Sequence, residues 1–141
     1  GGAPEMDAQL RYDFGIKMGL AFQLQDDYLD VYGDPAVFGK KIGGDILCNK
    51  KTFMLITALS LAEGEDKETL LNWLRATDYV AEEKIQSVTA LYNKVGVPEL
   101  CQARIDAYYK EGLELLDKVN VESSLKEELK KFVCHLMDRK L

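Results

Sequence analysis

The sequence predicts an all-α fold, and two observations support that prediction. Apolar residues recur at spacings of three and four along most of the chain, which is typical of amphipathic helices. No alternating run of apolar and polar residues is bounded by hairpin turns, so nothing indicates a strand. With 141 residues, the chain fits one small domain with room for a sizeable core.

The first expected helix is long and covers residues 4–32. Pro4 stands in the first turn, where a proline is tolerated, and Gly33 ends the helix. The apolar positions of this helix are Leu10, Phe14, Met18 and Ala21. Residues 33–48 then contain four glycines and Pro35, which predicts a loop whose backbone can approach a ligand closely.

All later elements are expected to be helices. Residues 63–66 read as a turn, Pro98 marks a helix start, and Ser123 or Ser124 is a candidate helix cap. The expected helices cover residues 50–62, 67–76, 80–95, 98–119 and 122–139.

The composition, 47% apolar and 30% charged, is that of a soluble globular protein. A net charge of −6 argues against nucleic acid as a partner, because such surfaces need Lys and Arg to neutralise phosphates. No long apolar run or signal-peptide pattern is present, so we expect no membrane insertion and a cytoplasmic location. Cys48, Cys101 and Cys134 lack CxxC spacing and are expected to be reduced thiols.

An acidic cluster occupies the last turns of the first helix. At about 100° per residue, Gln23, Asp26, Asp27 and Asp30 fall within an arc of about 100°, so we expect three carboxylates to converge. Like charges at this spacing, near a helix C-terminus, destabilise a helix unless a cation balances them. Carboxylate oxygens without Cys or His suit Mg²⁺ with a phosphorylated ligand. The alternative is a solvated acidic helix end.

Basic residues follow the cluster. Lys40 and Lys41 lie in the glycine-rich loop, and Lys50 and Lys51 begin the next expected helix. Ammonium groups and the backbone amides of a glycine loop both bind phosphate, so together these groups could hold a diphosphate. The alternative is a set of solvated surface lysines.

A single string of residues links the acidic and basic groups: Gly19-Leu20-Ala21-Phe22-Gln23, Asp26-Asp27-Tyr28-Leu29-Asp30, Gly33-Asp34, Gly39-Lys40, Gly43, Asp45 and Lys50-Lys51-Thr52. In content, order and spacing it resembles the trans-type polyprenyl diphosphate synthase family, which includes farnesyl and geranylgeranyl diphosphate synthases. A lone DDxxD motif is weak, but five matching elements across about 35 residues rarely coincide by chance. The resemblance implies the C-terminal helices of the isoprenoid synthase bundle, with residues 1–141 forming the C-terminal part of a polyprenyl synthase domain.

The resemblance also implies roles for the acidic residues. Asp26 would bind a magnesium ion that bridges to the allylic diphosphate. Asp30 would be a further ligand or accept a hydrogen bond nearby, and Asp27 would orient water molecules. The cofactor implied is therefore magnesium.

The substrate contacts that the resemblance implies come from four residues. Lys40 and Lys50 would contact the diphosphate, while Phe22 and Gln23 would face the substrates, Gln23 offering its amide oxygen to the developing cation. The implied reaction ionises the allylic diphosphate, lets the alkene of isopentenyl diphosphate attack, and removes a proton. Asp26, Lys40 and Gln23 are thus the candidate catalytic residues.

The family's first aspartate-rich motif, the arginines after it and a Lys-Thr pair are not found in this sequence. They would precede Gly1, so we expect a fragment that is inactive alone, from a parent enzyme of isoprenoid biosynthesis. Family members are usually homodimers, which implies a homo-oligomer. The alternative is a noncatalytic helical subunit that retains a diphosphate and magnesium site.

Overall fold

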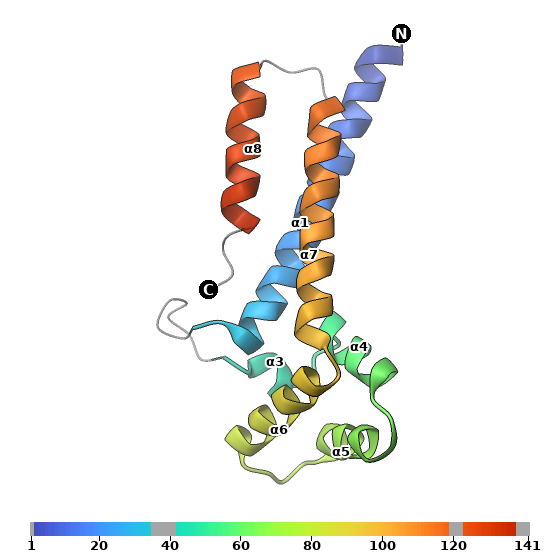
Figure 1. Cartoon of the computed structure of the whole chain (residues 1–141), viewed down its shortest axis with the longest axis vertical. Coiled ribbons are helices and arrows are strands. Elements are labelled where there is room, and N and C mark those ends of the chain that lie inside the picture. Colours follow the sequence, from blue (N-terminus) through green and yellow to red (C-terminus); the bar gives the residue numbers. More distant parts are fainter. Residues whose placement is uncertain (1, 35–41, 119–122, 138–141) are drawn as a thin grey trace. The chain divides into compact units, whose positions relative to one another are not determined.

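The computed structural model describes residues 2–34, 42–118 and 123–137, and those residues form helices joined by turns, without a strand (Figure 1). The all-α fold class is therefore confirmed. None of the described helices is both long and apolar enough to cross a membrane. The helices are α1 (Gly2–Tyr32), α3 (Gly44–Leu47), α4 (Phe53–Leu61), α5 (Gly64–Arg75), α6 (Ala81–Lys94), α7 (Val97–Lys118) and α8 (Ser123–Met137).

Most helix boundaries lie within a few residues of those that the sequence predicts, and three differences matter. The expected loop contains the short helix α3. Helix α5 begins at Gly64, so the prediction of a turn over residues 63–66 was wrong; Glu65 and Asp66 lie in its first turn, where acidic residues complement the helix dipole.

The third difference is the start of α4. Thr52 is its N-cap, and the Thr52 side-chain oxygen accepts a hydrogen bond from the Leu55 amide at 3.1 Å. This cap satisfies one of the amides that a helix start leaves without a partner. The helix therefore begins at Phe53 instead of near residue 50, and Lys50 lies in the turn before it.

Contacts divide the chain into two compact units. The first contains α1 as far as Gln25, α7 from Ala103 onward, and α8. The second runs from Asp26 to Gln102, so it contains the end of α1, helices α3 to α6 and the start of α7.

In the first unit, α1 and α7 are joined by buried and surface contacts. The Tyr109 hydroxyl donates to the Gln25 side-chain oxygen at 2.9 Å, and both side chains are almost fully buried. At the surface, Lys17 pairs with Glu111 at 2.8 Å. The buried apolar side chains of this unit include Ala21, Ile105, Leu116 and Val133.

In the second unit, α6 contacts α3, α4 and α5 (Figure 1). Trp73 of α5 donates its indole N–H to Ser87 of α6 at 2.7 Å. The buried residues of α6 repeat at intervals of four, and one of them is a lysine: Lys84, Val88 and Tyr92. Helix α6 is thus the element against which the segment between α3 and α4 is fixed.

Candidate functional site

The three carboxylates at the end of α1 differ in exposure. Asp26 is exposed, Asp27 is buried with only 7% of its surface accessible, and Asp30 is intermediate. Burial also raises the pKa of the nearby Cys101 thiol to about 12, and the charge of Asp27 adds to the increase. The surroundings of Asp27 are therefore poorly hydrated, which increases the cost of leaving its charge unbalanced.

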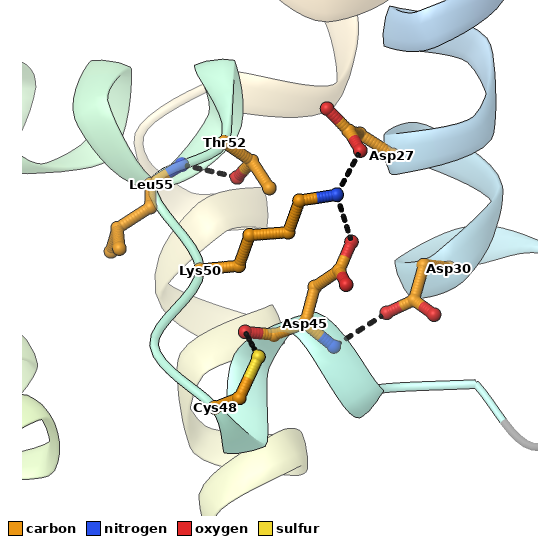
Figure 2. Close-up of polar contacts among 7 residues, drawn as sticks. All are labelled: Asp27, Asp30, Asp45, Cys48, Lys50, Thr52 and Leu55. Carbon is orange, nitrogen blue, oxygen red and sulfur yellow. Dashed lines mark hydrogen bonds and ion pairs between the residues drawn. The ribbon is translucent and has the colours of Figure 1, made fainter.

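Lys50 supplies a cation for this buried carboxylate. Its Nζ lies 3.1 Å from Asp27 Oδ1 and 3.9 Å from Asp45 Oδ2, and Figure 2 shows the ammonium between these two acids. The hydrogen bond to Asp27, followed by the charges of Asp27, Asp45 and Asp30, raises the pKa of the Lys50 ammonium. In this structure, a lysine of the same chain therefore supplies the positive charge that balances these carboxylates.

Asp30 is held by a different contact. Its Oδ2 accepts a hydrogen bond from the Asp45 amide at 2.9 Å, within the first turn of α3 (Figure 2). Its carbonyl oxygen accepts from the Gly43 amide at 2.6 Å. A carboxylate in the last turn of α1 is disfavoured by that helix's dipole, and the α3 amide offsets the cost.

Gly43 allows the chain to approach α6 closely. Its φ of 94° lies in the left-handed region, and a Cβ atom there would lie 2.6 Å from the Ile85 side chain. Any other residue would combine backbone strain with a steric clash. This glycine therefore fixes where α3 begins. It thereby fixes the position of the amide from which the Asp30 carboxylate accepts a hydrogen bond.

Backbone hydrogen bonds order the turn that carries Lys50. The Lys50 amide donates to the Asp45 carbonyl at 3.0 Å, and the Thr52 amide donates to the Lys50 carbonyl at 2.8 Å. The Thr52 side chain caps α4, as Figure 2 shows. The turn is thus tied to α3 on one side and to α4 on the other.

The carboxylates have the chemistry that magnesium requires, but they do not form a complete ligand set. Among the described residues, no three Asp, Glu, His or Cys side chains come together so as to hold a metal ion. In the described part of the chain the three acids do not converge as expected. Lys50 contacts Asp27, and the Asp45 amide donates to Asp30. Magnesium uses one or two carboxylates and completes its shell with water and phosphate oxygens, so this donor set still fits it.

Other site residues that the sequence predicts are less informative. Phe22 and Gln23 are exposed and belong to the part of α1 in the first unit. Lys40 lies outside the described residues, as do Gly39 and Lys41. Lys51 is exposed.

Sequence reasoning gave no role to three residues beside this site. Asp45 was part of the motif string, yet its contact with Lys50 was not anticipated. Asn49 and Lys84 were not noted at all, although their side chains meet at 2.6 Å next to Lys50. The signal for Lys84 is its position four and eight residues before the buried Val88 and Tyr92, on the apolar face of α6.

Comparison with known proteins gives a consistent result. A sequence model described as polyprenyl synthetase matches residues 1–93. A short chain isoprenyl diphosphate synthase of Methanothermobacter thermautotrophicus is 36% identical over 128 residues, covering 89% of this chain and 38% of that protein. A farnesyl pyrophosphate synthase of Homo sapiens is 38% identical over 94 residues, covering 66% of this chain and 22% of that protein.

Solved structures agree with the sequence matches. A geranylgeranyl pyrophosphate synthase superposes with a TM-score of 0.84 at 34% identity, covering 96% of this chain and 42% of that one. A second structure is the geranylgeranyl pyrophosphate synthase of Corynebacterium glutamicum complexed with isoprenyl diphosphate and magnesium. It superposes with a TM-score of 0.79 at 31% identity, covering 90% of this chain and 36% of that one. The chain therefore spans about two fifths of the length of the Methanothermobacter relative and of these two structures, and about a fifth of the human relative.

Proposed function

The chain belongs to the polyprenyl synthetase family, and on that premise we propose that the whole protein is a prenyltransferase that condenses isopentenyl diphosphate with an allylic diphosphate. The relatives named above as isoprenyl, farnesyl and geranylgeranyl diphosphate synthases support this reaction class. The single observation in the structure that favours it is Lys50 held between Asp27 and Asp45. A lysine of the kind that binds phosphate next to carboxylates of the kind that bind magnesium supports the proposal.

In this proposal Asp26, Asp27 and Asp30 are the residues that hold magnesium. Asp26 is the exposed member, which suits a ligand that meets a metal arriving with its substrate. When bound, magnesium supplies positive charge that neutralises the departing diphosphate. The neighbour crystallised with magnesium and isoprenyl diphosphate supports the choice of cofactor and ligand class.

Lys50 has a part in both states of the site. Without substrate, its ammonium balances Asp27 and Asp45 and keeps the cluster folded. With substrate, the same ammonium would contact the diphosphate, and Asp26, Asp27 and Asp30 would hold the magnesium. The side chain is 46% exposed, so it can reach a ligand without breaking the core. Lys40 from the glycine-rich loop is the second diphosphate contact that we propose.

Phe22 and Gln23 complete the proposed set as residues that face the substrates. Both are exposed on α1, which agrees with contact to a ligand. The Gln23 amide oxygen would lie toward the cation that develops when the allylic diphosphate ionises. Such a neutral oxygen stabilises positive charge without capturing it covalently.

The test is prenyl transfer by the full-length protein with Mg²⁺, isopentenyl diphosphate and allylic diphosphates of several lengths. Replacing Asp26→Ala is expected to lower kcat at least about 100-fold, because one fixed charge-stabilising group is lost. Asp78→Ala is the matched control, since Asp78 is an exposed acid before α6, and it should leave kcat unchanged.

Two outcomes would contradict the proposal. Full activity in Asp26→Ala would show that the acidic motif does not serve the reaction. No transfer by the unmodified full-length protein with any allylic substrate would instead favour a noncatalytic helical subunit that retains the diphosphate site.

A further inference from the structure

Helix α6 contains a lysine where an apolar residue is expected. Lys84 is 1% exposed and shares the buried face of the helix with Val88 and Tyr92. A buried ammonium is costly unless hydrogen bonds compensate for its lost hydration. Packing alone therefore does not explain a lysine at this position, and its hydrogen bonds have to be considered.

The Lys84 ammonium contacts three neutral groups. Nζ lies 2.6 Å from the Asn49 side-chain oxygen, 3.5 Å from the Leu47 carbonyl oxygen, and 4.7 Å from the centre of the Tyr79 ring. None of the ion pairs found among the described residues includes it. The hydrogen bonds of Lys84 go to the turn after α3.

The contacts of Lys84 fix an unusual backbone conformation. Asn49 has a φ of 56°, the one positive value among the described non-glycine residues. Its side chain is held on both sides, accepting from Lys84 and donating to the Leu74 carbonyl at 3.0 Å. The Leu47 carbonyl, at the end of α3, also accepts from the Tyr79 hydroxyl at 3.3 Å. The turn from Leu47 to Asn49 is thus anchored at both ends.

Lys50 follows this turn directly. The direction in which the Lys50 side chain leaves the backbone depends on the conformation of Asn49, because a residue in the left-handed region changes the local course of the chain. A direct contact of Lys84 with substrate is excluded by its burial. The adjacent cavity, lined in part by Asn49, Lys50 and Lys84, has a volume of about 10 Å³, room for about one water molecule and too small for a diphosphate.

We propose that Lys84 is a positioning residue, whose hydrogen bonds to Asn49 and Leu47 hold the turn that directs Lys50 toward Asp27 and the diphosphate. The catalytic consequence rests on the proposed function, whereas the effect on the turn does not. Partners that orient metal ligands typically change affinity or activity about 10- to 100-fold when they are lost, and we expect a similar scale for a partner that orients a phosphate-binding lysine.

The first experiment measures hydrogen exchange of the Lys50 backbone amide by NMR in the full-length protein. That amide donates to the Asp45 carbonyl at 3.0 Å, so its protection reports directly on order in the turn. Lys84→Met, which keeps the length and removes the donor, is expected to lower this protection at least about tenfold. Lys94→Met is the control, because Lys94 is an exposed lysine of the same helix that pairs with Asp66.

The second experiment measures binding of inorganic diphosphate with Mg²⁺ by calorimetry, and prenyl transfer kinetics. Lys84→Met is expected to raise the Kd for diphosphate and the KM about tenfold, with a smaller change in kcat. Asn49→Gly gives an independent version, since glycine adopts the same φ but cannot accept from Lys84, and it should reproduce both effects. If Lys84→Met does not fold, Asn49→Gly still tests whether the contact between Lys84 and Asn49 positions Lys50.

Unchanged protection of the Lys50 amide in a folded variant would overturn the proposal, even if its Tm fell. Lower protection with unchanged diphosphate affinity would also overturn it, because the turn would then not direct Lys50. A full-length protein without prenyl transfer would reject the proposed function alone; the exchange and calorimetry measurements would still decide the role of Lys84.

Discussion

Oppositely charged side chains meet in both units of the chain, and the pair at Lys50 in the second unit is held differently from the exposed pairs of the first unit. In the first unit, Lys17–Glu111 and Lys130–Asp117 are short pairs, at 2.8 and 2.7 Å, between side chains that are 33–57% exposed. In the second unit, the Lys50–Asp27 pair is longer, at 3.1 Å, yet the Asp27 side chain is only 9% exposed.

The comparison shows that distance alone does not rank these pairs. Exposed pairs contribute little because water screens them and because two long side chains lose freedom. Asp27 is screened less, and its partner stands on a turn that backbone hydrogen bonds and a helix cap fix. We therefore expect changes around that turn to have the larger effects, and changes to the exposed pairs the smaller ones.

The largest effect is expected at Gly43. Gly43→Ala adds a Cβ atom 2.6 Å from Ile85 at a φ of 94°, and should destabilise the fold by about 2–4 kcal/mol. Urea denaturation followed by circular dichroism measures the difference. Gly15→Ala is the control: this helical glycine has no atom within 4 Å of the added Cβ, and the change should stabilise by about 0.5–1 kcal/mol. Equal effects at the two glycines would show that the start of α3 is not constrained.

The next effect is expected at the cap of α4. Thr52→Ala removes the acceptor for the Leu55 amide and should cost about 1 kcal/mol of the free energy of unfolding. Thr52→Ser keeps the hydroxyl and should retain most of the stability. The same denaturation experiment applies, and a serine variant as weak as the alanine variant would indicate that the methyl group, not the cap, matters.

A smaller, pH-dependent effect is expected for Lys50. Its pKa is raised in the folded state, mainly by the hydrogen bond to Asp27. The pair therefore stabilises the fold fully at pH values below 10.5, the ordinary pKa of a lysine. That contribution is lost as pH rises through the raised pKa. Comparing the wild type with Lys50→Met by urea denaturation from pH 8 to 11.5 should show the difference shrinking only at the top of this range. A difference that shrinks from pH 8 onward would contradict the assignment.

The smallest effect is expected for the exposed pair of the first unit. The hydrogen bond from Lys130 lowers the pKa of Asp117, so the pair stabilises the fold at pH values above 3.8, the ordinary pKa of an aspartate. This stabilisation is lost as pH falls through the lowered pKa. Lys130→Met should shift Tm least among these variants at pH 7, and the shift should vanish in 1 M salt. A Tm loss as large as that of Thr52→Ala would reverse the ranking of the two regions.

The fold class, most helix boundaries and the family could be predicted from the sequence alone. These follow from local features: apolar spacing, Pro98 at the start of α7, and an acidic motif followed at fixed intervals by glycines and lysines. Helical geometry predicts that Asp26, Asp27 and Asp30 share one side of α1, since that prediction needs only the helical period.

The differences among those residues arise from how the chain folds and could not be predicted from the sequence. Burial separates Asp27 from Asp26, and the pairing of Lys50 with Asp27 joins residues 23 positions apart. Lys84 acts on Asn49 across 35 positions. Such contacts depend on which helices pack together, and the buried, poorly hydrated surroundings that give them their strength exist only after that packing has formed.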